Sequence, residues 1–234
     1  MGNFETTRWS VVLAARGTDS AARDALDHLC QTYWPPLYAF VRRQGHGVEQ
    51  AQDLTQDFFA RFIGDGFLDT VHPDRGRFRT FLLACVKHFL SHEREREHAR
   101  KREGNWDRVA LDLAGAEDRV APALVGLDTP ERAFERQWAL ALLDQVMAAL
   151  EREYGAKGRG ELFRALKGGL LGGTPPEAYR EIAERLDISE GAVKTAVYRL
   201  RKRYRELLHE EVARTVDTPE DVEVELRDLF AALR

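Results

Sequence analysis

Residues 179–204 read YREIAERLDISEGAVKTAVYRLRKRY, and this stretch has the pattern of a helix-turn-helix. The small Ala183 lets a second helix approach closely, and Ser189 is placed to cap that second helix. The hydrophobic core between the two helices would be formed by Ile182, Leu186 and Ile188. Asp187 stands in the turn, where glycine is common because it adopts positive φ angles without strain. The segment therefore predicts two helices packed across a tight turn.

The second helix of this motif has an apolar face and a polar face. Steps of three and four residues place five side chains inward, namely Val193, Ala196, Val197, Leu200 and Tyr204. The outward side chains are Gly191, Thr195, Tyr198, Arg199 and Lys202. Such a helix fits the major groove of DNA, where its N-terminal residues reach base edges and its later basic residues reach phosphates. The alternative is an ordinary helical hairpin with a solvated basic face.

Charge is distributed unevenly along the chain. The 234 residues carry a formal net charge of −4, and residues 215–234, with six acidic and two basic side chains, account for all of it. Residues 193–205, in contrast, hold six basic side chains and no acidic one. This local concentration of positive charge is the electrostatic footprint expected of a phosphate-binding surface.

Length and composition indicate a folded protein. A chain of 234 residues with 44% hydrophobic residues can bury the core of one large domain or of two small ones. No run approaches the ~18 consecutive apolar residues of a membrane span, and the first ten residues lack an export signal, so we expect a cytoplasmic protein without membrane association. Cys30 and Cys85 lie far apart without a CxxC pair, which indicates small core residues rather than a disulfide or a zinc site.

Apolar residues recur at helical spacing along almost the whole chain, so the predicted fold class is all-α. Besides the two helices of the helix-turn-helix, we expect helices at 9–15, 21–43, 48–63, 77–102, 131–154, 161–171 and 219–233. Glycine, proline and weak periodicity mark residues 104–130 as a linker. The predicted domains are a helical domain at 1–103, the linker at 104–130, the helix-turn-helix domain at 131–214 and a tail at 215–234.

The acidic tail has the pattern of a separate amphipathic helix. Thr218 is placed as its N-cap, directly before Pro219. Its apolar stripe consists of Val222, Leu226, Leu229, Phe230 and Leu233. A large apolar side chain left in water forfeits about 1.5–3 kcal/mol, so the stripe should dock on the protein. Because the nearest basic surface in sequence is 194–205, we expect the tail beside the helix-turn-helix, either as structural support or as a cover over its DNA-reading face.

Helix 48–63 carries an acidic stripe opposite its apolar side. The apolar side holds Ala51, Leu54, Phe58 and Phe62. The other side holds Glu49, Asp53, Gln56 and Asp57, with Phe59 near the boundary. An acidic stripe with an aromatic ring at its edge can dock a partner helix, although such a stripe is also typical of a solvated face.

Residues 72–88 interleave arginines with aromatic rings, as in the run Arg75-Gly-Arg77-Phe78-Arg79-Thr80-Phe81. This pattern suits single-stranded nucleic acid, because bases stack on the rings while guanidinium groups hold the backbone. Each of the two phenylalanines fits equally well as a core residue of an amphipathic helix.

Together and in this order, the three stretches resemble an extracytoplasmic-function (ECF) sigma factor, the small two-domain class of bacterial transcription initiation factors. The segment Asp53-Leu-Thr-Gln56-Asp57-Phe-Phe is similar to the family's polymerase-docking helix. The segment Phe78-Arg79-Thr80-Phe81-Leu82 is similar to the start of the family's promoter-melting helix. The segment Ser189-Glu-Gly-Ala-Val-Lys194 is similar to the start of the family's recognition helix. The resemblance implies a non-enzymatic subunit that recruits core RNA polymerase, reads the minus-thirty-five element as duplex and captures the opened minus-ten strand.

The resemblance also implies which residues meet each partner. Core RNA polymerase would be bound by Asp53, Leu54, Gln56, Asp57 and Phe59. The minus-ten strand would be bound by Arg75, Arg77, Phe78, Arg79, Phe81, Lys87 and His88. The minus-thirty-five element would be bound by Ser189, Glu190, Gly191, Lys194, Thr195, Tyr198, Arg199 and Lys202. No catalytic residue, cofactor or metal is implied.

The chain departs from the family pattern at several positions. Gln52 replaces an acidic residue of the docking helix, Phe81 replaces tryptophan, and His88 and His92 stand where Asn and Asp are common. The acidic tail lies outside the two-domain pattern and resembles an extension found in one ECF-like subgroup. Further partners to consider are an anti-sigma protein and a Ser/Thr kinase acting at Thr55, where a phosphate would supply the missing negative charge. Against the kinase, Thr55 lies close to the apolar side of its helix.

Two other classes of function remain open on the sequence. A helix-turn-helix repressor or activator would bind palindromic operators as a dimer, without polymerase. An enzyme would have to use His88 and His92, which lie one helical turn apart and can share a metal. Zinc peptidases place a glutamate directly after the first histidine, where this chain has Phe89, and no nucleophile-base motif is recognisable. An enzyme is therefore disfavoured.

Overall fold

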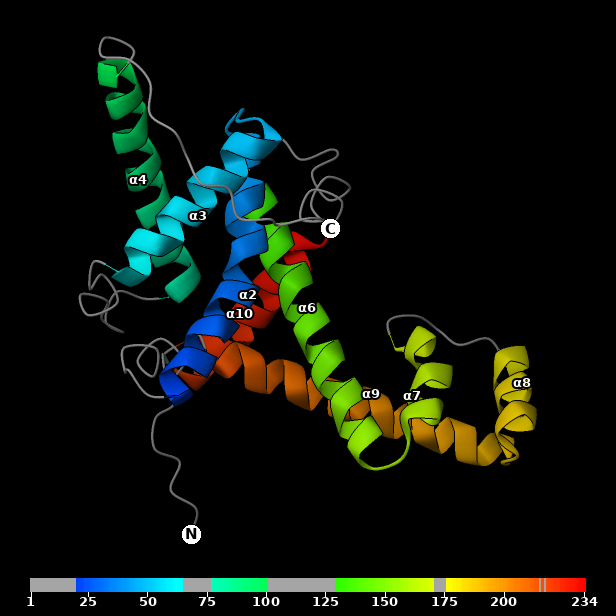
Figure 1. Cartoon of the computed structure of the whole chain (residues 1–234). Helices are drawn as coiled ribbons and strands as arrows, with labels where there is room; N and C mark the ends of the chain where they lie inside the picture. Colours follow the sequence, from blue (N-terminus) through cyan, green and yellow to red (C-terminus); the bar gives the residue numbers. More distant parts are fainter. Residues whose placement is uncertain (1–19, 65–76, 101–128, 171–175, 215, 217) are drawn as a thin grey trace. The chain divides into compact units, whose positions relative to one another are not determined.

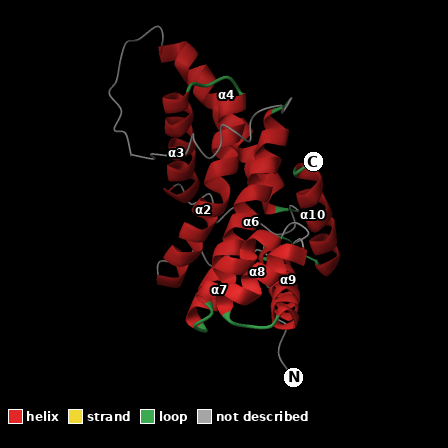
Figure 2. Ribbon diagram, turned by 90° about the vertical axis from the view of Figure 1, so that its right-hand side faces the viewer, coloured by secondary structure: helices red, strands yellow, loops and turns green. Residues whose placement is uncertain are grey.

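The computed structural model describes residues 20–64, 77–100, 129–170, 176–214, 216 and 218–234, and all regular structure in these ranges is helical (Figures 1 and 2). The helices are α2 (Ser20–Arg43), α3 (Val48–Gly64), α4 (Phe78–Arg100), α6 (Pro130–Ala156), α7 (Gly160–Leu166), the 3₁₀ helix η3 (Lys167–Gly169), α8 (Pro176–Leu186), α9 (Glu190–Ala213) and α10 (Pro219–Ala232). The predicted all-α class is confirmed. No described helix is long and apolar enough to cross a membrane.

The chain divides into two compact units. The first unit comprises residues 1–141 and 212–234, and the second unit comprises residues 142–211. The boundaries between the units fall inside α6 and α9, so each of these helices lies partly in the first unit and partly in the second. The observed division falls inside α6, eleven residues beyond the expected end of the linker at 130, and it assigns the tail to the first unit. The expected linker lies almost wholly outside the described residues, as does the expected helix at 9–15.

The first unit is built on α2, α3, α4 and α10 with the first half of α6. Its core is rich in aromatic rings, and the fully buried large side chains include Tyr33, Phe40, Phe78, Phe134 and Trp138. The rings of Tyr33 and Phe78 meet edge to face, with centroids 5.0 Å apart, so the start of α4 is anchored on α2. Helix α3 packs beside α2 after a short turn, in which Gly45 adopts a φ of 95° that disfavours other residues.

The second unit contains α7, η3, α8 and parts of α6 and α9. Its core is formed by apolar side chains at helical spacing, namely Val146, Leu150, Phe163, Leu166, Ile182, Val193, Val197 and Leu200. This unit holds the predicted helix-turn-helix as α8 and the first part of α9.

Helix α10 confirms its predicted N-cap but corrects the expected partner of the tail. The Thr218 hydroxyl accepts a hydrogen bond from the backbone N–H of Asp221, whose carboxylate in turn accepts from the Thr218 N–H, completing a capping box. The helix belongs to the first unit and pairs there with α4, whereas the expected partner was the basic segment 194–205. Its stripe also differs from the prediction, because Phe230 is 51% exposed while Glu225 is buried.

Candidate functional site

The turn between α8 and α9 has the geometry that its sequence suggests. Asp187 adopts a φ of 52°, the left-handed conformation in which glycine is usual. The next N–H, of Ile188, donates to the carbonyl of Ala183 at 3.0 Å and closes the end of α8. The hydroxyl of Ser189 accepts a hydrogen bond from the N–H of Ala192 at 3.2 Å, so the predicted cap of α9 is confirmed.

One part of the predicted helix-turn-helix core is wrong. Ile182 is buried and Leu186 is half-buried, but Ile188 is 38% exposed. The reversal of the chain at Asp187 turns the following side chain outward, which helical periodicity does not reveal because periodicity ends where the helix ends.

The outer face of α9 is exposed along its first half. The predicted inward side chains are buried, with Ala196 half-buried, and the predicted outward ones are exposed, Tyr198 by 65%. All eight predicted minus-thirty-five residues are exposed on this helix and its cap, namely Ser189, Glu190, Gly191, Lys194, Thr195, Tyr198, Arg199 and Lys202. The Thr195 hydroxyl donates to the carbonyl of Gly191 at 2.9 Å, so toward a partner it can still act as an acceptor.

Two of the six basic residues in 193–205 have partners on other elements of the second unit, whereas Lys202 pairs with Glu206, and Arg205 with the carbonyl of Arg201, within α9 itself. Arg201 donates to the carbonyl of Gly169 at 2.6 Å. Arg203 donates to both carboxylate oxygens of Glu153, at 2.6 and 3.0 Å, and these hydrogen bonds raise the pKa of Arg203 and lower that of Glu153. These two arginines therefore hold α9 in place, and the phosphate-binding potential rests on the others.

The acidic stripe of α3 is partly accessible. Asp53, Gln56 and Asp57 are half-buried, whereas Leu54 and Phe59 are buried at 2% and 8% exposure. The two apolar residues therefore support the helix from inside, and the three polar ones form the surface that a partner would meet. Thr55 is fully buried and donates to the carbonyl of Ala51 at 2.7 Å, so a kinase could reach its hydroxyl only after local unfolding.

The start of α4 differs most from the prediction. Phe78 is 1% exposed and Arg79 is 5% exposed, so in this conformation neither can contact a DNA strand. Arg79 donates to Glu225 of α10 from Nε at 2.6 Å and from Nη2 at 3.0 Å. It also pairs with Asp228 and Glu135, and its guanidinium lies 4.5 Å from the ring centroid of Trp138.

The remaining predicted minus-ten residues lie nearer the surface. Arg77 is half-buried and pairs with Glu225 and Asp228 of α10. Phe81 is half-buried, Lys87 and His88 are exposed, and Arg75 lies outside the described residues. Lys87 pairs with Glu131 of α6 at 2.8 Å. The carboxylates that pair with Arg77 and Lys87 were not predicted, because nothing in the local sequence marks partners that are distant along the chain, such as Asp228, which is 151 positions from Arg77.

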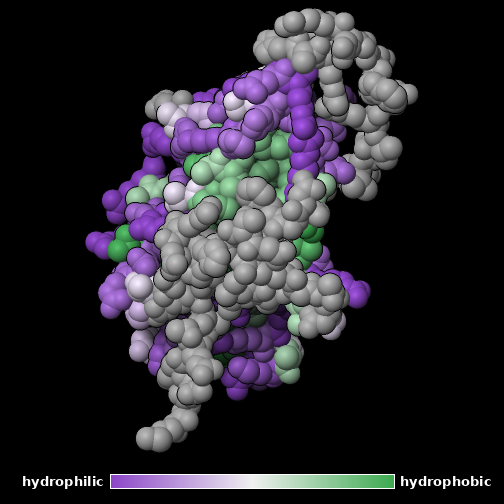
Figure 3. All heavy atoms as spheres, turned by 90° about the vertical axis from the view of Figure 1, so that its left-hand side faces the viewer, coloured by the Kyte–Doolittle hydropathy of each residue, from purple (hydrophilic) through white to green (hydrophobic). Residues whose placement is uncertain are grey.

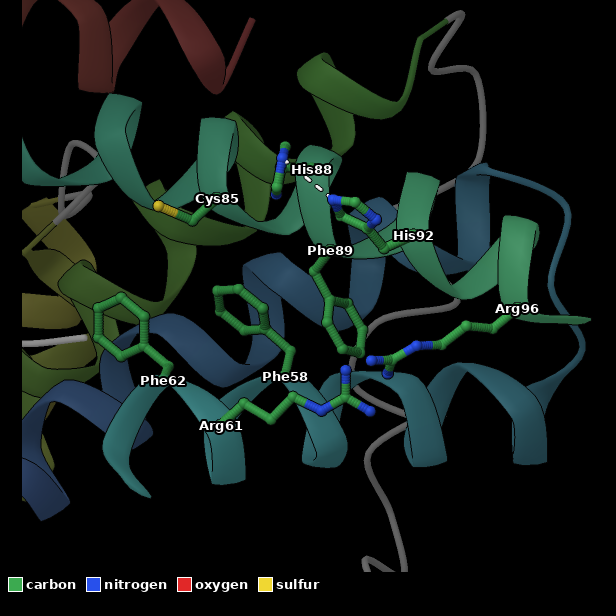
Figure 4. A pocket seen from close by; sticks show the side chains of 8 residues that line it. All are labelled: Phe58, Arg61, Phe62, Cys85, His88, Phe89, His92 and Arg96. Atoms are coloured by element: carbon green, nitrogen blue, oxygen red, sulfur yellow. Dashed lines mark hydrogen bonds between the residues drawn. The ribbon is translucent and has the colours of Figure 1, made fainter. Parts of the chain in front are cut away.

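A pocket of about 300 Å³ lies between α3 and α4 (Figure 4). Its floor is made by the rings of Phe58, Phe62 and Phe89, and polar side chains of α3 and α4 surround them. Arg61 lies 5.1 Å from the ring centroid of Phe89 and pairs with the buried Glu93. The face of the molecule that carries α3 and α4 shows an apolar patch bordered by hydrophilic side chains (Figure 3).

Two stretches of the chain match known protein-family models. Residues 29–101 match sigma-70 region 2, and residues 178–203 match sigma-70 region 4. The first match spans most of α2 with α3 and α4, and the second spans α8 and the first half of α9. No curated protein and no solved structure was found to match the chain.

Proposed function

We propose that this chain, which belongs to the ECF sigma factors because it carries their two hallmark domains in order, directs core RNA polymerase to promoters that it reads at two elements. As a sigma factor it acts in transcription initiation, and the proteins of its families are non-enzymatic. The specific proposal concerns which of its surfaces meets each partner.

The observation that carries the proposal is the exposed outer face of α9. It presents Lys194, Arg199 and Lys202 around Thr195 and Tyr198, on a helix whose opposite side is buried. A helix held in this way can enter the major groove as a rigid body, with basic groups on phosphates and the other two side chains on base edges. We assign this face to the minus-thirty-five element.

The minus-ten strand and the polymerase are assigned to the first unit. Five residues of segment 72–88 remain candidates for strand contact, namely Arg75, Arg77, Phe81, Lys87 and His88. The buried Phe78 and Arg79 instead support α4 from inside. Capture of a melted base by stacking contributes about 1–3 kcal/mol, which can offset part of the cost of opening the duplex. Core polymerase is assigned to the acidic surface of α3 formed by Asp53, Gln56 and Asp57.

One reconstitution tests the proposal. The purified chain is mixed with bacterial core polymerase and genomic DNA, and transcript starts are sequenced against a reaction with core polymerase alone. We expect starts that require the chain and share two upstream elements. A protein that binds duplex operators as a dimer and yields no polymerase-dependent starts would instead be a helix-turn-helix regulator, and the proposal would be rejected.

A further inference from the structure

Two histidines on α4 stand together on the rim of the pocket between α3 and α4. His88 and His92 are separated by four residues, so they lie on the same face of the helix, and both are exposed. Their Nε2 atoms lie 3.2 Å apart and their rings meet at 73° (Figure 4). We propose that His88 and His92 form a chelating site for a divalent transition-metal ion of the zinc class.

The distance between the two nitrogens supports this site. A tetrahedral zinc ion holds imidazole nitrogens at about 2.0–2.1 Å, which places two of them about 3.3 Å from each other. The observed 3.2 Å is close to that separation, and rotation of the two exposed rings about their side-chain bonds would turn both lone pairs toward one ion. Without metal the same distance fits an N–H···N hydrogen bond, in which one ring donates to the other.

A carboxylate lies on the side of the His92 ring opposite His88. The Nδ1 atom of His92 lies 3.6 Å from a carboxylate oxygen of Glu95, while its Nε2 atom faces His88. Outer carboxylates commonly orient metal-binding histidines in this way.

The charges around the pair also permit a cation. The nearby basic groups have acidic partners, since Arg61 and Arg96 each pair with Glu93 at 2.9 Å and Lys87 pairs with Glu131. Because Arg61 and Arg96 share the one carboxylate of Glu93, these three basic groups carry one more charge than their two partners, and Glu95 beside the two rings offsets that charge.

The site would be an open one. Cys85 lines the same pocket, but its sulfur points away from the two imidazoles in Figure 4. Among the described residues no three His, Cys, Asp or Glu side chains are grouped closely enough to enclose a metal ion. Water would therefore complete the coordination, and the expected affinity is that of a two-ligand chelate rather than of a closed structural zinc site.

The test uses the full chain purified without a histidine tag and titrated with zinc chloride by calorimetry. We expect one zinc ion per chain, with the affinity lowered at least about tenfold in His88→Gln and in His92→Gln, and by a smaller factor in Glu95→Gln. His209→Gln is the matched control, because it removes an exposed histidine of α9. Circular dichroism would verify that each variant is folded.

A second measurement identifies the ligands. Electron paramagnetic resonance of the Cu²⁺-loaded chain should show coupling to two imidazole nitrogens, and this coupling should be lost in the double variant His88→Gln/His92→Gln. Zinc binding of unchanged stoichiometry and affinity in that double variant, or no zinc binding by the native chain, would overturn the proposal. Both measurements are made without polymerase or DNA, so the proposed function and this site can fail separately, although His88 is also a candidate for strand contact.

Discussion

Arg79 and Glu225 form a bidentate ion pair inside the first unit, between residues 146 positions apart. The side chain of Arg79 is 6% exposed and that of Glu225 is 1% exposed. The pair is the most buried part of a network, because Glu225 also pairs with Arg77, and Arg79 also pairs with Asp228 and Glu135. Mutual pairing offsets the cost of burying these charges. The acidic tail is therefore an integral part of the fold around the start of α4.

Neutralising Glu225 should destabilise the first unit. In Glu225→Gln the buried Arg79 guanidinium loses its bidentate partner but keeps Asp228 and Glu135, so the cost should lie below the value of about 3–5 kcal/mol that is typical of a buried charge left unpaired. Urea unfolding followed by circular dichroism would measure the change. The matched control is Glu223→Gln, an exposed residue of the same helix, whose effect should be small. Equal stabilities of the two variants would contradict the role given to this ion pair.

Deleting residues from Pro219 onward should lower the melting temperature without tightening the binding of promoter DNA. The deletion removes Val222 and Leu229, both buried, together with the carboxylates that pair with Arg77 and Arg79. Calorimetry and fluorescence anisotropy on a minus-thirty-five duplex would measure the two quantities. A truncated protein with higher promoter affinity and more transcription, most visibly at low salt, would show instead that the tail is inhibitory.

The tail illustrates what sequence can and cannot predict in this protein. Its capping residue Thr218 follows from local rules, and the structure confirms it. The arginines that pair with its carboxylates were not predicted, because the nearest basic segment in sequence is 194–205, while the observed partners Arg77 and Arg79 are distant in sequence. Glu225 is buried together with the apolar side of α10 because it pairs with Arg79, and hydrophobic periodicity does not detect such a pair.

The same reasoning applies to the N-terminal helices. The sequence placed helices at 21–43 and 48–63, and the observed α2 and α3 match within one residue. Helix α2 passes through Pro35 and Pro36, and the buried side chains Tyr33, Leu37 and Phe40 continue its inner face on both sides of them. Whether Phe78 belonged to a core or to a binding surface was open, and its burial against Tyr33 assigns it to the core.

Charge reversal on α3 should abolish association with core polymerase. In Asp53→Lys/Asp57→Lys the half-buried acidic surface becomes basic, so a partner that matches the native charge would be repelled. A pull-down with core polymerase measures association, and circular dichroism measures helicity, which should persist. Asp24→Lys/Asp27→Lys, on exposed positions of α2, reverses the same amount of charge and should leave binding intact. Undiminished association of the α3 variant would remove this surface from the proposal.

Two kinds of change on α9 should have different effects on DNA binding. If Arg199 and Lys202 contact phosphates, Arg199→Ala and Lys202→Ala should each weaken binding on every sequence and reduce the salt dependence, log K against log salt, by about 0.9 per lost contact. Thr195→Ala and Tyr198→Ala should instead change which upstream sequence is preferred, since the exposed Tyr198 ring and the exposed Thr195 side chain are placed to meet base edges.

Anisotropy titrations at several salt concentrations, on the promoters found by transcript mapping and on scrambled duplexes, would separate these effects. Lys157→Ala is the matched control, because it removes one positive charge from an exposed position near the end of α6 in the same unit. Its salt slope should equal that of the native chain, because long-range charge alone changes the slope much less than a lost phosphate contact does. If all four α9 variants weakened binding equally on promoter and scrambled DNA, base recognition would not lie on this face of α9.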